Sequence, residues 1–443
     1  MTRYGLINEF LEGIFMALNL LLGQTLSFSG DPFKQPWQDV TQHRTDGAVL
    51  LENGHIHKVG DRATLRAEHP QANVTDYGED LIVPGFVDAH VHYPQTAIIA
   101  SWGKRLIDWL NTYTFPEEMR LTDPIYAAEI AGRYLDIALS HGTTTMASYC
   151  TTAPTSVNAY FEAAAQRGMR VVGGKTCMDR NAPESLLDSA HRAYDESKEL
   201  IDTWHGTGRA VYAITPRFSP TSTPEQLHSL GALWAERPNC LMQTHLSEQI
   251  EEIAWMRDLF PNARDYLDTY AQHGLLGERG VYGHAIHLEP REIDQLADVG
   301  ASVVHCPTSN MFIGSGLFDL MGLAKAKVGL GLASDIGGGS NFSMLRTMAA
   351  TYEVAQLRGA APHPAQLMWL ASEGSAKTLH LSGKVGHLGA GAEADLCILN
   401  LSSTQAIDQR RRNANDFWEA VFPTIMMGDD RAVRKVWLGG EPI

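Results

Sequence analysis

Two histidines stand one residue apart in DAHVHYPQ, residues 88–95, directly after an apolar run and a turn. Successive side chains of a strand point to opposite faces, so His90 and His92 would share one face and could bind the same ion. Two later apolar runs end in further donors, His245 in THLSE and Asp335 in LASD. Three imidazoles and a carboxylate suit Zn²⁺, with Fe²⁺ as the alternative. The pattern therefore predicts one metal ion per chain.

A second His-x-His pair in the same sequence serves as a comparison. His55 and His57 follow Asn53-Gly54, a dipeptide typical of a tight β-hairpin turn. The hairpin offers no further metal-ligating side chains near this pair, so we expect these two histidines to be solvated strand residues. Three other histidines without a comparable context are expected to be structural or exposed: His141, His287 and His305.

Three more polar residues end or follow apolar runs and could act beside the ion. Glu248 stands three residues after His245, where a carboxylate could serve as a general acid and base. His284 ends the run GVYGH and could be either a metal ligand or a hydrogen-bonding residue. Arg217 ends the run AVYAITPR and would place a guanidinium at the same end of the predicted strands as the metal ligands.

The elements that must position these residues alternate regularly along the chain. Eight strand–helix units in about 300 residues predict an α/β fold of the (β/α)₈ TIM-barrel type, in which the carboxyl ends of the strands meet at one mouth. A doubly wound sheet is the alternative, but no GxGxxG follows the first strand. The expected strands lie within 81–92, 142–149, 169–175, 210–218, 240–248, 280–285, 301–309 and 327–335, and the clearest helices within 123–142, 155–168 and 223–237.

Strand-like patterning also occurs on both sides of the barrel segment. We expect residues 16–80 and 382–443 to pair as a small flanking β-sandwich domain built from both chain ends, beside a catalytic barrel over 81–381. Residues 1–15 look like an N-terminal extension. The apolar run 14–22 falls short of the ~20 residues that span a bilayer, and no signal-peptide pattern accompanies it. We therefore expect no membrane association.

Composition and charge narrow the class of protein further. The chain is 44% hydrophobic and 19% charged, as in ordinary globular proteins. A net charge of -16 argues against a nucleic-acid surface, which is normally basic. The five cysteines are odd in number, scattered and free of any CxxC pair, which favours a reducing compartment. We expect a cytoplasmic protein with a small-molecule substrate.

Several motifs, in this order, resemble the amidohydrolase superfamily: PGFVDAHVH, THLSE, YGHA, SDIGGG and GAGAEADLCILN. The segments HVHYPQ, WLNTYTFPEE, KTCMDRNAP, TPRFSPTS, HLSEQIEEI and CPTSNMFIGSGLF narrow the resemblance to the guanine deaminase family. It covers the chain from about residue 20 to the C-terminus. The resemblance implies a homodimeric hydrolase (EC 3.5.4.3) that converts guanine and water into xanthine and ammonia through a metal-activated water.

The resemblance also implies a role for each site residue. Glu248 corresponds to the family's acid/base carboxylate, and His284 to the histidine that supports the activated water together with Asp335. The family's metal ligands fall on His90, His92, His245 and Asp335, and its substrate-binding residues on Gln95, Arg217, Phe218, His245, Glu248 and Asp335.

The chemistry of guanine fits these side chains. Gln95 can both donate and accept, so its amide could pair with O6 and N1–H of the base. Arg217 could fork onto the O6/N7 edge, and Phe218 could pack against the ring. Glu248 would carry a proton from the attacking water to ring N3 and then to the amine that leaves C2.

Other functions remain open at this level. The nearest is another mononuclear deaminase that acts on a different purine, pyrimidine or triazine. A binuclear cyclic-amide hydrolase needs a carboxylated lysine after the fourth strand, whereas Lys175 belongs to the third. The H-x-E and P-C-x-x-C motifs of cytidine-deaminase zinc sites are absent. A non-catalytic scaffold would be expected to lack a ligand or Glu248, and this sequence has them all.

Overall fold

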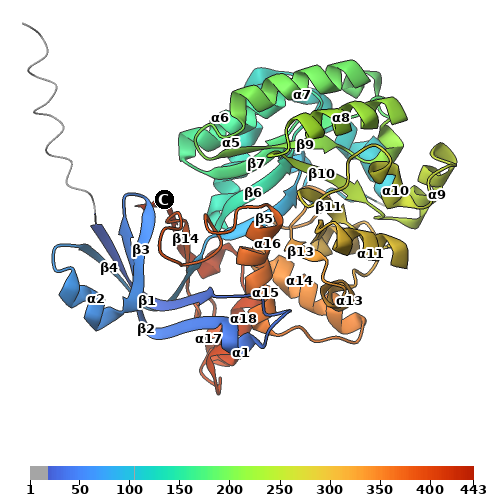
Figure 1. Cartoon of the computed structure of the whole chain (residues 1–443). Helices are drawn as coiled ribbons and strands as arrows, with labels where there is room; N and C mark the ends of the chain where they lie inside the picture. The colour runs from blue at the N-terminus through green and yellow to red at the C-terminus, as the bar shows by residue number, and fades with distance from the viewer. Residues whose placement is uncertain (1–17, 104) are drawn as a thin grey trace, which may run out of the picture.

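The centre of the molecule is a nearly closed barrel of parallel strands in the order β5-β6-β7-β9-β10-β11-β12-β13 (Figure 1). A computed structural model describes residues 18–103 and 105–443, so the expected extension at 1–15 lies outside the described residues. All eight predicted strands are present, which confirms the (β/α)₈ prediction. They are β5 (Phe86–Val91), β6 (Thr143–Tyr149), β7 (Arg170–Gly174), β9 (Ala210–Pro216), β10 (Leu241–Leu246), β11 (Gly280–His284), β12 (Ser302–His305) and β13 (Gly329–Leu332), and β8 (Thr176–Cys177) pairs with β9.

Helices surround the barrel, and local signals in the sequence explain where they begin and end. Asp123 caps one helix by accepting the backbone N–H of Ile125, and Gly168 ends the next in the left-handed conformation that glycine tolerates. None of the described helices is both long and apolar enough to cross a membrane. The outer helices are α5 (Pro124–Ser140), α6 (Pro154–Arg167), α7 (Ala190–Trp204), α8 (Pro224–Glu236), α9 (Ile250–Leu259), α10 (Tyr266–Ala271), α11 (Pro290–Asp298), α13 (Leu320–Lys325) and α14 (Met344–Leu357).

Short helices occupy several of the segments that connect the longer elements of the barrel. One of these, α4 (Phe115–Arg120), begins with Pro116 in its first turn, where the missing N–H costs nothing. The others in the loops are η1 (Tyr93–Ile98), α3 (Leu106–Trp109), η2 (Leu110–Thr114), η3 (Glu184–Leu186), η4 (Ser219–Thr221), α12 (Pro307–Phe312), α15 (Pro364–Trp369), η5 (Leu370–Gly374) and α16 (Ser375–Thr378).

The barrel closes between β5 and the chain that follows β13. The backbone N–H of Asp335 donates to the carbonyl of His90 at 3.1 Å. One residue earlier, the N–H of Ser334 donates to the carboxylate of Asp88 at 2.9 Å. Two of the predicted metal ligands therefore lie on the seam that closes the barrel.

A single seven-stranded mixed sheet lies beside the barrel and contains strands from both chain ends (Figure 1). The predicted hairpin is confirmed: Glu52 pairs with His55, and Asn53 and Gly54 have φ values of 52° and 78°, as a type I′ turn requires. The strand order is β16 (Glu441–Pro442), β15 (Val433–Leu438), β14 (Leu396–Leu399), β4 (Asn73–Pro84), β1 (Leu18–Phe28), β2 (Thr41–Glu52) and β3 (His55–Asp61), with helices α1 (Trp37–Val40), α2 (Arg62–Glu68), α17 (Gln405–Arg411), α18 (Phe417–Met427) and η6 (Asp430–Ala432) at its margins.

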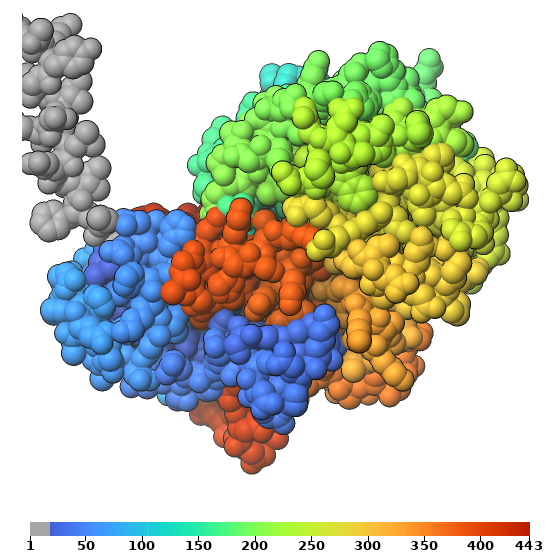
Figure 2. Space-filling model, viewed as in Figure 1, coloured from blue at the N-terminus to red at the C-terminus, as the bar shows by residue number. Residues whose placement is uncertain are grey.

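Charged and aromatic contacts join this sheet to the barrel. Arg170 and Arg209, at the amino ends of β7 and β9, both donate to the carboxylate of Glu393, at 2.7 and 3.0 Å from their Nε atoms. Trp37 stacks on His363 with ring centroids 4.1 Å apart. Figure 2 shows the N-terminal residues (blue) directly against C-terminal residues (orange and red) on the same face. The two chain ends thus form one unit that packs on the barrel.

Candidate active site

Three histidines and an aspartate, from strands far apart in the sequence, meet at the carboxyl end of the barrel. His92 Nε2 lies 3.1 Å from His245 Nε2. Asp335 Oδ1 lies 3.5 Å from His90 Nε2 and 3.6 Å from His92 Nε2. All four side chains are buried. The structure therefore brings together the residues that the sequence predicts as metal ligands.

The donor atoms of this cluster suit a cation. His90 Nε2 is buried and has no hydrogen-bond partner within the described part of the chain. His245 Nδ1 lies 2.6 Å from the carbonyl oxygen of Arg217 and donates to it, which leaves Nε2 as a lone-pair donor toward the cluster. Burial lowers the pKa of His92 and His245 well below the usual range, with neighbouring histidines adding to the shift. The neutral imidazole that results is the form that binds a metal.

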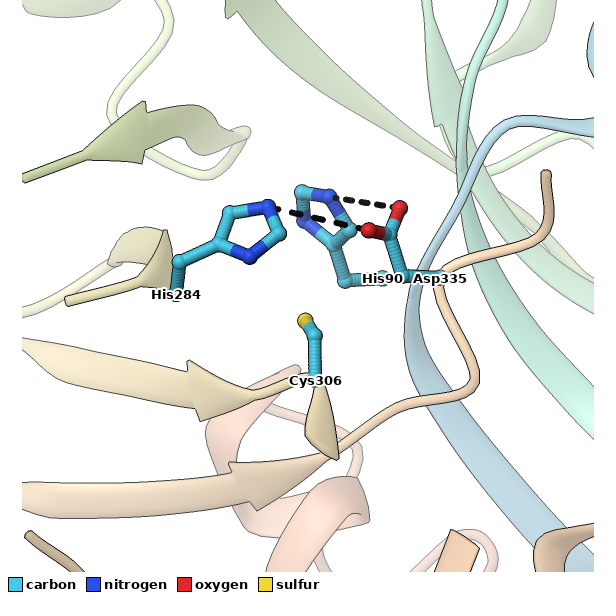
Figure 3. A group of neighbouring side chains, drawn as sticks. All are labelled: His90, His284, Cys306 and Asp335. Carbon is cyan, nitrogen blue, oxygen red and sulfur yellow. Dashed lines mark ion pairs between the residues drawn. The ribbon is translucent and has the colours of Figure 1, made fainter. Parts of the chain in front are cut away.

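His284, at the end of β11, faces two carboxylates. Its Nε2 lies 3.7 Å from Asp335 Oδ2 (Figure 3). The same nitrogen lies 3.5 Å from Glu248 Oε2, while Nδ1 lies 2.8 Å from Asn310 Oδ1. Burial opposes protonation, but Glu248 and Asp335 outweigh it and raise the pKa of His284. This position suits a group that shares a proton with the two carboxylates.

Cys306 is a neighbour that sequence reasoning missed. It follows β12, and its thiol lies among His90, His284 and Asp335, all with ligand atoms within 4.8 Å of one another (Figure 3). Burial raises the pKa of Cys306 well above its usual range, and Asp335 adds to the shift. The side chain is therefore a neutral thiol that packs beneath the histidines. Its segment, CPTSN, was part of the resemblance, but nothing in the spacing indicated a place at the mouth.

Glu248 lies in the loop after β10 and is only 2% exposed, which excludes a surface position. Burial raises the pKa of Glu248 and the charge of Asp335 raises it further, while the charge of His284 acts in the opposite direction without cancelling the rise. Ser315 donates to Glu248 Oε1 at 2.8 Å. Behind the loop, the carboxylate of Glu252 accepts the backbone N–H groups of Glu248 and Gln249 at 3.0 and 3.1 Å. The loop is therefore held from both sides.

A pocket opens beside the cluster and is lined by all six residues predicted to bind substrate, among them Gln95, Arg217 and Phe218. Phe218 packs in a buried apolar group together with Leu110 and Phe115, which fixes the wall of the pocket. The remaining lining residues are His92, Leu106, Trp109, Thr114, His245, Glu248, His284, Ser309, Ile313, Asp335 and Gly338. The pocket combines a flat apolar wall with a polar edge, as a heterocycle requires.

Glu118, on α4, is the second residue that sequence reasoning missed. It is 1% exposed and accepts hydrogen bonds from two of the predicted substrate-binding residues. Gln95 Nε2 donates to Oε1 at 2.9 Å, and Arg217 Nη1 donates to Oε1 and Oε2 at 3.0 and 2.8 Å. The motif WLNTYTFPEE contains this residue, but its two adjacent glutamates cannot be distinguished without the tertiary contacts.

The residues expected to lie away from the site do so. His55 and His57 are exposed on β3, with His57 Nδ1 3.1 Å from Glu52. Lys175 follows the third barrel strand, and its amino group pairs with Asp188 instead of joining the histidine cluster. The three histidines without a comparable context are structural. His141 Nδ1 lies 2.9 Å from the carbonyl oxygen of Ile137, His287 Nε2 lies 2.8 Å from that of Ser315, and the His305 ring stacks on Phe318 with centroids 4.4 Å apart.

Comparison with known proteins agrees with this geometry. The model of the amidohydrolase family matches residues 81–443, and that of a bacterial imidazolonepropionase-like composite domain matches residues 47–72. The chain is 42% identical over 397 residues to guanine deaminase of Escherichia coli (strain K12), covering 89% of this chain and 90% of that protein. The chain belongs to the guanine deaminases of the amidohydrolase family.

Solved structures place the whole fold in this family. The E. coli guanine deaminase structure gives a TM-score of 0.93 at 39% identity and covers 96% of this chain and 99% of that one. Guanine deaminase from C. acetobutylicum, solved with bound guanine in its active site, gives 0.88 at 25% identity, covering 96% and 100%. A zinc-bound adenosine deaminase from Xanthomonas campestris, 21% identical, gives 0.81 over 96% of this chain and 92% of that one, and so shares the fold.

Proposed function

We propose that this chain hydrolyses guanine to xanthine and ammonia. The observation that carries the proposal is one pocket in which an amide, a guanidinium and an aromatic ring lie beside a buried cluster of histidines and carboxylates. The similarity to guanine deaminases over nine-tenths of the chain supports the same substrate. Another deaminase of the same family, acting on a different heterocycle, is the alternative.

His90, His92, His245 and Asp335 would hold one Zn²⁺ per chain, with Fe²⁺ as the second candidate. The unpartnered Nε2 of His90 and the facing Nε2 atoms of His92 and His245 support this assignment. When bound, such an ion supplies a water that is activated at neutral pH.

The chain's own side chains would bind and orient the base. Gln95 and Arg217 are placed to pair with the O6 edge of guanine, and Phe218 to pack against its ring. With the ring held in this way, C2 would face the carboxylate of Glu248 at the other side of the pocket. The buried apolar side chains that line the pocket, Trp109 and Leu110 among them, would limit the water around the bound ring.

Glu248 would move the protons of the reaction. It accepts a proton from the attacking water as the C2–O bond forms and passes that proton to ring N3. It then takes the remaining hydroxyl proton at C2 and delivers it to the amine, as the C2–N bond breaks and ammonia leaves. Burial raises the pKa of Glu248, which suits a group that must take up and release a proton near neutrality. His284 and Asp335 would orient the water from the opposite side.

The direct test is an assay of the purified, metal-loaded protein on guanine, adenine, cytosine and a triazine, with xanthine and ammonia quantified as products. We expect guanine to be preferred by several orders of magnitude, because a site built to pair with O6 and N1–H leaves buried polar groups unmatched with the other rings. Preference for another ring would overturn the substrate assignment. Metal analysis of the same sample tests the predicted one ion per chain.

Two further expectations follow from the family and the composition. We expect a homodimer, which light scattering of the purified protein would test. We expect a cytoplasmic location, which fits the five cysteines because all are free and buried.

A further inference from the structure

Glu118 lies behind the polar edge of the pocket and contacts both residues that would read the base. It accepts from Gln95 Nε2 at 2.9 Å and from Arg217 Nη1 at 2.8 and 3.0 Å. The Arg217 guanidinium also lies 5.6 Å from the ring centroid of Phe115, on the same helix as Glu118. A buried carboxylate in this position constrains the two side chains in front of it.

The constraint on Gln95 is directional. A side-chain amide has a donor end and an acceptor end of nearly the same shape, so rotation by half a turn exchanges the two. A carboxylate paired with an arginine only accepts, so the nitrogen of Gln95 must face Glu118. The flipped amide would place its oxygen against a carboxylate oxygen and lose a hydrogen bond to a charged group.

This direction distinguishes two kinds of heterocycle edge. Guanine presents an acceptor at O6 and a donor at N1–H, whereas a 6-aminopurine presents a donor at the exocyclic nitrogen and an acceptor at N1. A freely rotating amide pairs with either edge. When its nitrogen bonds Glu118, the amide of Gln95 holds its second N–H and its oxygen in one fixed arrangement. The second N–H can then donate to O6 while the oxygen accepts from N1–H, which fits the guanine edge and not the 6-aminopurine edge.

We propose that Glu118 is a specificity-determining positioning residue: it fixes the amide of Gln95 and the guanidinium of Arg217 so that the pocket accepts 6-oxopurines and rejects 6-aminopurines. This inference rests on the proposed function, because it concerns the same pocket and the same two side chains. Arg217 reinforces the selection, since Nη1 bonds Glu118 and its remaining N–H donors match acceptors at O6 and N7 but not an exocyclic amine.

The experiment compares guanine with 2,6-diaminopurine, which carries the same amine at C2 but the 6-amino edge instead of the 6-oxo edge. The ratio of kcat/KM for the two substrates is measured in the metal-loaded wild type and in Glu118→Gln. A glutamine at 118 offers both a donor and an acceptor to Gln95, so the amide is free to flip. We expect guanine efficiency to fall roughly 10- to 100-fold, with the ratio falling at least tenfold, while metal content is unchanged.

Glu117 provides a matched control on the same helix. It is also buried, but it pairs with Arg120 at 2.9 Å and with Tyr126, away from the pocket. Glu117→Gln makes the same chemical change one residue away and should leave the substrate ratio at the wild-type value. In a Gln95→Met background, Glu118→Gln should change the ratio much less, because the amide that Glu118 orients is gone.

The outcomes are separable. This inference would be overturned if folded, metal-loaded Glu118→Gln kept the ratio of kcat/KM for the two substrates within about twofold of wild type. An equal loss of efficiency on both substrates counts as such a result. If Glu118→Gln does not fold, Glu118→Asp, which keeps the charge but withdraws the oxygens from Gln95, must show the same fall in ratio. A wild type that does not deaminate guanine would instead refute the proposed function, whatever the variants do.

Discussion

His90 and His55 carry the same side chain in the same His-x-His spacing, yet only His90 lies among other donors. The nitrogen of His90 is buried without a partner in the described part of the chain, whereas His55 is exposed beside the carbonyl of Asn53. Whether such a histidine can bind a metal therefore depends on which other side chains the neighbouring strands place around it.

Replacing His90 or Asp335 with alanine should therefore remove most of the bound metal and reduce turnover by at least two orders of magnitude, because three donors bind an ion far less tightly than four. Metal analysis of the dialysed protein and an initial-rate assay measure both effects. His55→Ala and His57→Ala are the controls and should match wild type. If those two variants lost the metal while the His90 and Asp335 variants retained it, the ion would belong to the pair His55 and His57 and not to the barrel site.

Glu248→Gln tests the proton shuttle at the residue scale. The substitution keeps the size of the side chain and an acceptor for Ser315 but removes the titratable carboxylate. Metal content should stay at the wild-type level, guanine should still bind, and kcat should fall roughly 100-fold or more, the usual scale for general acid–base catalysis. Turnover near the wild-type value would exclude Glu248 from that role.

At the scale of elements, the close approach of β11 to β5 depends on a glycine. A Cβ on Gly283 would lie 2.6 Å from Cε1 and 2.8 Å from Nδ1 of the His90 ring. The barrel strands can therefore bring His90 and His284 to one mouth only because this position has no side chain. Loops then complete the site, since Glu248 and Glu118 both lie outside the strands.

Gly283→Ala should displace the His90 ring and lower metal affinity by about 10- to 100-fold, the range seen when the support of a ligand is disturbed. Competition with a chelator would measure this affinity. Gly132→Ala is a suitable control, because a Cβ at that helical position meets only the flexible end of Arg167 at 3.3 Å. Equal metal affinity in both variants would contradict the packing argument.

At the scale of the whole molecule, the composite sheet is joined to the amino end of the barrel through Glu393. Its carboxylate accepts hydrogen bonds from Arg170 and Arg209, which lie at the amino ends of neighbouring barrel strands. Burial alone would raise the pKa of Glu393, but the two arginines outweigh it and lower the pKa. The ion pair therefore stabilises the folded chain above the unfolded-state pKa, and this contribution is lost as the pH falls through the lower, folded-state value.

Glu393→Gln should lower the free energy of unfolding by about 1–3 kcal/mol at neutral pH, because the buried guanidinium of Arg170 loses its charged acceptor and Arg209 keeps only Asp395. Below the ordinary glutamate pKa of 4.5, the difference between wild type and variant should shrink as the wild-type carboxylate becomes protonated. Urea titrations at several pH values measure this difference. A constant difference across that range would contradict the assigned role. Activity at neutral pH should be retained while both proteins are folded.

The sequence alone determined the barrel, the hairpin at Asn53-Gly54 and which residues form the candidate metal site. Periodicity and turn residues act over a few positions, and the carboxyl ends of barrel strands must meet, so the sequence is sufficient to group His90, His92, His245 and Asp335. Only the tertiary structure showed that Glu118 bonds Gln95 and Arg217, or that Cys306 lies beneath the histidines. The contacts of Glu118 join a loop helix to residues that follow two different strands, and no spacing in the chain encodes them, because they arise when separate elements pack.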